Sequence, residues 1–171
     1  MALILIAACG GGAAQPSPKP ASATPVAHIT VSSPDLPGTV PRQFTCDGGN
    51  KVPRVQWTSV SAREWALEMV DPDAPGGNFA HWVVYGIPAI ATSIGPQLPA
   101  GALEGKNGRG QSGYTGPCPP AGPAHHYHFV VSALDAALGL SAGVSLAELD
   151  ARMSGHVIAT GELVATYQRS G

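Results

Sequence analysis

Glycine and proline interrupt this chain at short intervals, which restricts it to short secondary-structure elements. Its 171 residues include 22 Gly and 17 Pro. These numbers are high for a helical protein and suit short strands joined by many turns. A chain of this length can form one domain with a real core, whereas a second full domain would be cramped. The sequence therefore predicts a mostly β protein with a single domain.

Charged side chains are few and balanced. They make up 12% of the chain against 44% hydrophobic residues, and the formal net charge is −2. Such a composition is unlike that of a disordered tail. Because the chain also has no run of Lys or Arg, we expect no nucleic-acid partner.

The first 25 residues read as a unit separate from the domain, which we place at residues 26–171. An apolar stretch at residues 2–8 ends in Ile6-Ala7-Ala8-Cys9 and is followed by glycines. This order resembles a bacterial lipobox, which implies cleavage before Cys9 and lipidation of its sulfur. The stretch is too short for a transmembrane helix, which needs roughly 20 residues. The alternative is an apolar N-terminus without a targeting role, and the usual positively charged start is missing.

Residues 10–25 are rich in Gly, Ala, Pro and Ser, and this composition predicts an extended, solvated tether. We therefore expect an exported lipoprotein anchored in the bacterial cell envelope, with its mature start at Cys9. Export would place Cys46 and Cys118 in an oxidising compartment, where they form a possible disulfide.

The alternation of apolar and polar residues predicts the strands. In residues 63–70, for example, Trp65, Leu67 and Met69 share one face and Glu68 lies on the other. Ser145 and Glu148 form a capping-box pattern that predicts a short helix ending near Ser154. Residues 95–123 are expected to form a long loop, and residues 156–161 fit either a helical turn or a strand. The predicted strands are 26–32, 40–45, 63–70, 80–87, 124–134 and 163–169.

Three segments carry side chains suited to chemistry. Asp71 to Pro75 reads as a rigid turn at the end of an apolar strand, where a carboxylate can lie at the mouth of a cavity. His81 begins the next apolar strand. A stiff Gly/Pro stretch, 116–122, precedes three histidines at positions 125, 126 and 128. Exposed backbone N–H groups in such a stretch can bind an anion.

The histidines also raise the question of a zinc site. Strand parity places His125 and Tyr127 on one face and His126 and His128 on the other, so they cannot all bind one metal. His125 with His81 and Asp71 could still hold zinc. Because no other zinc-ligand motif accompanies them, we expect no metal and no cofactor.

Taken in order, the motifs resemble the phosphatidylethanolamine-binding protein family, and more narrowly its bacterial Raf kinase inhibitor-like branch. The motifs are Asp71-Pro72-Asp73-Ala74-Pro75, His81-Trp82-Val83-Val84-Tyr85-Gly86-Ile87-Pro88, and Gly116-Pro117-Cys118-Pro119-Pro120 with His125-His126-Tyr127. The resemblance covers about residues 28–169. It departs from the branch at Val52 to Val55 and at Glu68, where an apolar residue is usual.

The resemblance implies a fold of two antiparallel sheets with small C-terminal helical elements. It also implies a surface pocket for a small anion or a phosphate-containing headgroup, used for binding or modulation without catalysis. A phosphoester hydrolase and an inhibitor of a protein partner, such as a protease or kinase, remain alternatives; export argues against a cytoplasmic kinase. The implied pocket residues are Asp71, Ala74, Pro75, His81, Gly116, His125 and Tyr127.

Overall fold

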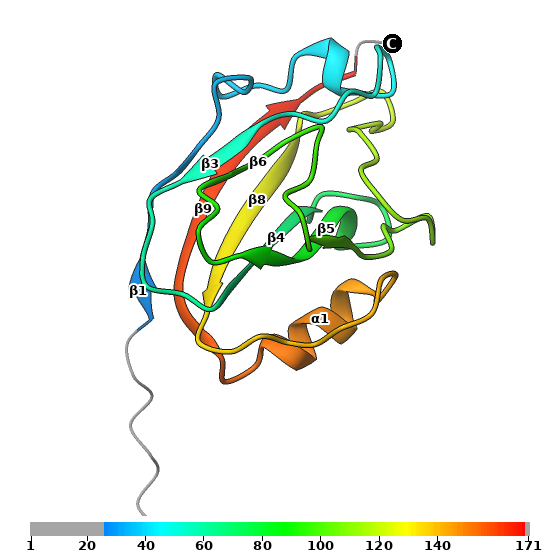
Figure 1. Cartoon of the computed structure of the whole chain (residues 1–171). Helices are drawn as coiled ribbons and strands as arrows, with labels where there is room; N and C mark the ends of the chain where they lie inside the picture. The colour runs from blue at the N-terminus through cyan, green and yellow to red at the C-terminus, as the bar shows by residue number, and fades with distance from the viewer. Residues whose placement is uncertain (1–25, 170–171) are drawn as a thin grey trace, which may run out of the picture.

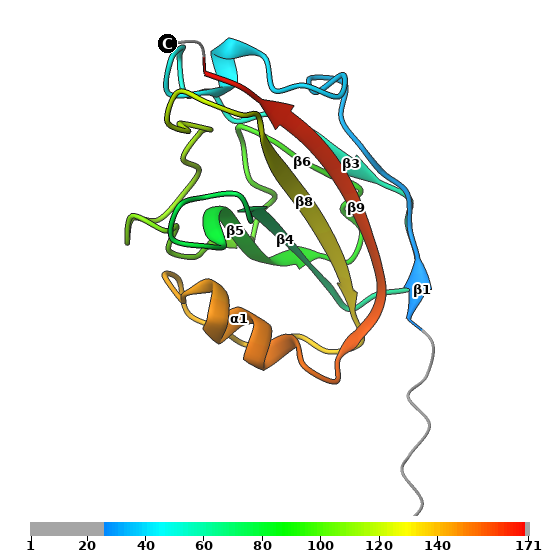
Figure 2. The ribbon, with the colours of Figure 1, turned by 180° about the vertical axis from the view of Figure 1, so that it is seen from behind.

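The computed structural model describes residues 26–169, which form two β-sheets, one α-helix and a short 3₁₀ helix (Figures 1 and 2). The larger sheet has six strands in the order β1-β9-β8-β4-β5-β7, and the smaller has the order β2-β3-β6. Strand pairs are antiparallel apart from β1 with β9. The mostly β fold predicted from the sequence is thus confirmed. The elements are β1 (Ala27–His28), β2 (Val31–Ser32), η1 (Arg42–Phe44), β3 (Val55–Trp57), β4 (Glu64–Asp71), β5 (Phe79–Pro88), β6 (Ser93–Ile94), β7 (Leu103–Glu104), β8 (His125–Leu134), α1 (Leu146–Met153) and β9 (Val157–Tyr167).

Strand parity divides the core into two layers. Trp65, Leu67 and Met69 of β4 are fully buried and belong to the core between the two sheets. Ala66, on the opposite face of β4, belongs to a second core that includes Leu149 of α1. The alternation read from residues 63–70 is therefore confirmed, and it explains how one strand supports both layers.

Large side chains of the smaller sheet pack into the core between the two sheets. Trp57 of β3 packs against Trp65 of β4, with ring centroids 5.5 Å apart and planes tilted by 50°. Val55 and Ile94 come from paired positions of β3 and β6 and are buried in the same core. Burial of this aromatic and aliphatic surface supplies most of the drive to fold.

The predicted capping box opens α1. The Ser145 hydroxyl accepts a hydrogen bond from the Glu148 backbone N–H at 3.3 Å, and the Glu148 carboxylate accepts one from the Ser145 N–H at 2.7 Å. Met153 is the last helical residue, and Gly155 follows with a φ of 83°. No helix within residues 26–169 is long and apolar enough to cross a bilayer.

At two places the structure decides between a strand and a turn. The strand predicted at residues 40–45 is wrong: Pro41 is followed by the 3₁₀ turn η1, in which the Phe44 N–H bonds to the Pro41 carbonyl at 2.9 Å. Pro41 cannot donate to a sheet ladder, which favours the turn. The ambiguous residues 156–161 mostly join the strand expected at 163–169, and the single strand β9 begins at Val157.

Candidate functional site

The three chemically interesting segments meet because their strands are antiparallel neighbours. β4 ends at Asp71, which lies opposite Phe79 at the start of β5, and β8 starts at His125 on the other side of β4. The end of β4 therefore shares one edge of the sheet with the beginnings of β5 and β8. A carboxylate and two imidazoles converge there from positions up to 54 residues apart.

Asp71 holds His125 in one orientation. The Nδ1 atom of His125 lies 2.8 Å from Oδ2 of Asp71, and both side chains are buried. Because a carboxylate accepts, Nδ1 donates, and Nε2 is the ring nitrogen left to meet a ligand. The other carboxylate oxygen accepts the backbone N–H of Asp73 at 2.9 Å. The turn thus fixes the carboxylate, and the carboxylate fixes the imidazole.

His81 is fixed by the loop that passes over it. Its Nδ1 donates to the carbonyl of Thr115 at 2.6 Å, while the Thr115 N–H donates to the carbonyl of His81 at 2.8 Å. Its Nε2 lies 4.0 Å from Oδ2 of Asp71. Burial lowers the pKa of His81, and the nearby Arg109 and His125 lower it further. The hydrogen bond to Thr115 and the charge of Asp71 raise it, but the net shift is downward. His81 therefore favours the neutral form near pH 7.

These side chains open into a cavity of about 310 Å³. A larger open groove of about 760 Å³ lies elsewhere, but the single charged side chain in its lining, Arg54, already pairs with Asp35 at 2.8 Å. The smaller cavity is therefore the better candidate site, since Arg109 and the Nε2 atoms of His81 and His125 remain available to a ligand. Its lining residues are Asp71, Ala74, Pro75, Phe79, His81, Arg109, Cys118, Pro119, Pro120 and His125.

The family resemblance implies Gly116 and Tyr127 as pocket residues, but neither is among the residues that line this cavity. The Gly116 N–H donates to Oδ1 of Asn50 at 2.7 Å, and a side chain at Gly116 would collide with the carbonyl oxygen of Phe44. Tyr127 is fully buried and packs edge-on against the ring of His81, with centroids 5.1 Å apart. Both residues support the wall, Gly116 through the loop and Tyr127 through His81.

The buried hydroxyl of Tyr127 has no hydrogen-bond partner among residues 26–169. Burial, together with nearby Asp71 and other acidic groups, raises its pKa. Tyr127 therefore stays an uncharged phenol throughout the neutral range.

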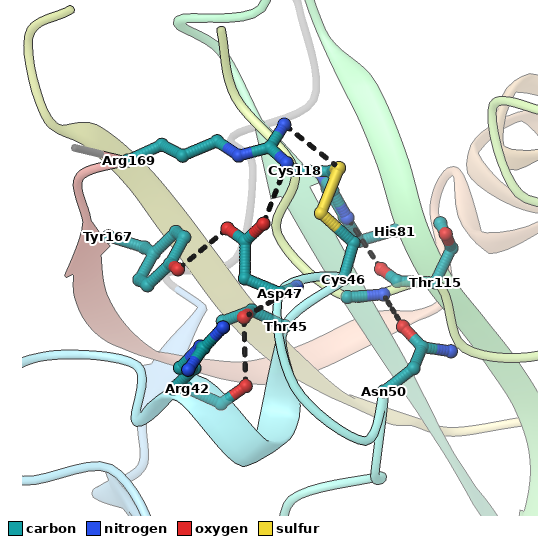
Figure 3. The surroundings of a disulfide bond; sticks show 11 residues. Arg42, Thr45, Cys46, Asp47, Asn50, His81, Thr115, Cys118, Tyr167 and Arg169 are labelled. Atoms are coloured by element: carbon teal, nitrogen blue, oxygen red, sulfur yellow. Dashed lines mark hydrogen bonds and ion pairs between the residues drawn. A yellow bond between two sulfur atoms is a disulfide. The ribbon is translucent and has the colours of Figure 1, made fainter. Parts of the chain in front are cut away.

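A disulfide fastens one wall of the cavity. Cys46 is bonded to Cys118, a lining residue, and the Cys46 N–H donates to the carbonyl of Pro117 at 3.1 Å. Figure 3 shows the bond between the loop that carries Asn50 and the loop that carries Thr115. Arg169 lies beside it, pairing with Asp47 at 2.7 Å. The Gly/Pro loop is therefore tied to the sheet through His81 and to the N-terminal part of the domain through sulfur.

The Gly/Pro stretch singled out in the sequence contributes Cys118, Pro119 and Pro120 to the lining, but two further lining residues, Phe79 and Arg109, were not predicted. Arg109 supplies a positive charge at the cavity, yet it lies in the long loop where no periodicity indicates direction. Composition offers one indication of its role. An anion site favours a nearby positive charge, and Lys106 and Arg109 are the two basic residues of the stretch 95–123.

The remaining histidines of β8 face away from the cavity, as parity predicts. His126 pairs with Asp73 at 2.8 Å, and His128 pairs with Glu162 at 2.7 Å. Within the part of the chain that the structure describes, no group of three His, Cys, Asp or Glu side chains could hold a metal ion.

Comparisons with known proteins agree on one family. A family model described as "Phosphatidylethanolamine-binding protein" matches residues 30–168. The UPF0098 protein PH1269 of Pyrococcus horikoshii is 40% identical over 76% of this chain and 71% of its own length. A Mycobacterium tuberculosis protein named "Putative lipoprotein LppC" is 34% identical over 97% of this chain and 91% of its own length. The crystal structure of Escherichia coli YbcL, titled a new member of the mammalian PEBP family, has a TM-score of 0.77 at 31% identity. It covers 83% of this chain and 99% of the YbcL chain.

Proposed function

Since the chain belongs to the phosphatidylethanolamine-binding protein family, we propose that it binds a small anion or a phosphate-containing headgroup around Asp71, His81 and His125. The observation that carries this proposal is the convergence of two oriented imidazoles and Arg109 on one cavity. In both rings Nδ1 is occupied, so each offers Nε2 to a ligand. A phosphate oxygen bound to such nitrogens gains charge-assisted hydrogen bonds when the rings are protonated.

Asp71 acts in this proposal as an orienting group. A bare carboxylate would repel an anion, but this one accepts hydrogen bonds from His125 and from the Asp73 backbone. Such a contact fixes the tautomer and the orientation of an imidazole. Asp71 thereby keeps Nε2 of His125 directed at a ligand.

The same lining favours binding over turnover. It includes no Ser or Thr, and its single cysteine, Cys118, is bonded to Cys46. A hydrolase working through a side-chain nucleophile needs one activated by an adjacent base. The Asp71–His125 pair could act as a base, but none of these side-chain nucleophiles accompanies it.

We further propose that residues 1–25 act as a lipoprotein signal and tether for the domain at 26–171, with a lipid on Cys9. These N-terminal residues lie outside the described part of the structure. The lipobox-like order before Cys9 and the relative named as a lipoprotein support the proposal. Native mass spectrometry of protein purified from its own membrane should show the mass of a lipidated Cys9, and an unmodified, uncleaved N-terminus would contradict it.

Calorimetric titration with inorganic phosphate tests the binding function. Wild type should bind phosphate, and His125→Ala should weaken binding by about tenfold or more, as expected when one charge-assisted hydrogen bond is lost. His128→Ala is the matched control, because that histidine lies on the opposite face of β8. Absence of binding by wild type, or unchanged binding by His125→Ala, would overturn the proposal.

A further inference from the structure

Arg109 is held at the rim of the cavity by a loop with a buried organising residue. Asn107 is only 6% exposed, and its side-chain oxygen accepts the Arg109 N–H at 2.9 Å. Its side-chain amide donates to the carbonyl of Gly113 at 3.0 Å, and its own carbonyl accepts the Gly110 N–H at 2.8 Å. Because the side chain and the backbone carbonyl of this buried residue are all hydrogen-bonded within the loop, they fix the conformation of the turn.

The residue before Arg109 fixes the turn to the cavity wall. The Gly108 N–H donates to the carbonyl of Ala80 at 2.8 Å, and a Cβ at Gly108 would collide with the ring of Phe79. Phe79 itself lines the cavity and packs against His81, with ring centroids 4.8 Å apart. Arg109 therefore follows directly after a backbone position in close contact with the site.

The charge of Arg109 is available to a ligand. It is the one Lys or Arg among the lining residues, and within residues 26–169 it makes no ion pair. Its field also disfavours protonation of His81. An anion placed between the guanidinium and the imidazoles would relieve this repulsion, and a second negative charge would strengthen the effect.

The shape of a guanidinium and the size of the cavity favour one class of phosphate. Arginine binds two oxygens of one group through parallel N–H donors. A phosphomonoester has three terminal oxygens, so two can meet Arg109 while the third reaches an imidazole. Its single ester arm can leave through the cavity mouth. A phosphodiester has two non-bridging oxygens and one negative charge, so it cannot give two oxygens to Arg109 and a third to an imidazole. Its two ester arms also need more room than one arm in a cavity of about 310 Å³.

We propose that Arg109 makes this pocket selective for the terminal phosphoryl group of a phosphomonoester over the internal phosphodiester of an intact zwitterionic headgroup. This inference rests on the proposed anion-binding function. The phosphoryl group can belong to a soluble metabolite or to a lipid such as a phosphatidate, since the recognised chemistry is the same.

The test is calorimetry on the full-length chain carrying Cys9→Ser, so that no lipid anchor contributes. Phosphoethanolamine serves as the monoester probe and glycerophosphoethanolamine as the diester probe. The parent chain should bind the monoester about tenfold or more tightly than the diester, and Arg109→Gln should remove most of that difference through loss of a charge-assisted pair. Lys106→Gln is the matched control, since this exposed cation of the same loop does not line the cavity.

The outcomes separate the two proposals. Equal binding of both probes by the parent chain, or an unchanged preference in Arg109→Gln, would overturn the selectivity and leave anion binding intact. Binding of neither probe while inorganic phosphate still binds would also overturn the selectivity, and loss of phosphate binding as well would overturn both. Flotation with phosphatidate vesicles, compared with phosphatidylcholine vesicles and with glycerol 3-phosphate titration, distinguishes the two sources. Vesicle binding that Arg109→Gln abolishes supports a lipid ligand, and glycerol phosphate binding without flotation supports a soluble one.

Discussion

Asp71 and His125 are 54 residues apart in the chain, yet Oδ2 of one lies 2.8 Å from Nδ1 of the other inside the protein. The antiparallel pairing of β4 with β8 brings them together, and the turn after β4 directs the carboxylate. This pair leaves Nε2 of His125 available to a ligand and fixes the direction in which the imidazole points into the cavity.

Replacing Asp71 tests the orienting role. We expect Asp71→Ala to weaken phosphate binding in calorimetry by about tenfold, because His125 loses the acceptor that fixes its tautomer. Asp73→Ala is the matched control, since that carboxylate pairs with the outward-facing His126. Tighter binding in Asp71→Ala would show that repulsion of the anion dominates and would contradict the orienting role.

Anion binding should strengthen as the pH falls. Burial lowers the pKa of His81, so this ring is neutral near pH 7 before an anion binds, and a bound anion raises the pKa again. Binding then takes up a proton, and the affinity rises between about pH 8 and about pH 6. Sulfate is the suitable probe, because it does not titrate in this range. His81→Gln should flatten the profile, whereas His156→Gln, which removes an exposed histidine paired with Asp135, should leave it unchanged. A profile that stays flat in wild type would contradict this.

Glu68 should make the domain less stable as the pH rises. Its side chain lies on the face of β4 that does not carry Leu67 and Met69. Burial is the main cause that raises the pKa of Glu68 to about 8, and the nearby Asp150 of α1 is the second. Its Oε1 has no hydrogen-bond partner among residues 26–169. Between the unfolded pKa and the folded pKa the native state holds a proton that the unfolded state lacks, so stability falls as the pH rises through that window.

Glu68→Gln should remove this dependence and increase the free energy of unfolding near pH 8 by a few kcal/mol, on the order of 2–4, as the linkage relation requires. Denaturant unfolding at several pH values measures it. Glu162→Gln serves as the control, because that carboxylate is exposed on β9 and pairs with His128. A parallel pH dependence in wild type and Glu68→Gln would contradict the prediction.

The disulfide should support both stability and the cavity. Cys46→Ser with Cys118→Ser opens a link across 72 residues, and loss of such a link typically lowers the free energy of unfolding by about 2–4 kcal/mol. Phosphate binding should weaken as well, because Cys118, Pro119 and Pro120 line the cavity. Treatment with a thiol reductant should reproduce both effects in wild type and have none in the double variant. Unchanged affinity after reduction would show that the loop keeps its place without sulfur.

The sequence predicts the parts of this fold that carry a regular residue pattern, such as alternating apolar residues in a strand or a capping box at the start of a helix. The alternation of Trp65, Leu67 and Met69 identified the face of β4 that packs on the smaller sheet, and Ser145 with Glu148 identified the start of α1. The strand predicted at residues 40–45 is wrong, because Pro41 and local hydrogen bonds favour a turn.

In the candidate site, too, the residues that lie in strands could be predicted, whereas the residue that lies in an irregular loop could not. Asp71, His81 and His125 could be placed because each lies at or near the end of a recognisable strand. Arg109 could not, since its position depends on Asn107 and Gly108 within a loop that has no periodicity. Parity correctly grouped Tyr127 with His125, but two residues along a strand move a side chain about 7 Å. Tyr127 therefore packs behind His81.

The central claim is that the cavity around Asp71, His81 and His125 binds an anion, and a crystal structure of the protein soaked with phosphate tests it most directly. We expect one phosphate in this cavity, with its oxygens within hydrogen-bond distance of Nε2 of His81 and Nε2 of His125, and with Arg109 turned toward it. A cavity that holds only water at a phosphate concentration that saturates binding in solution would contradict the claim.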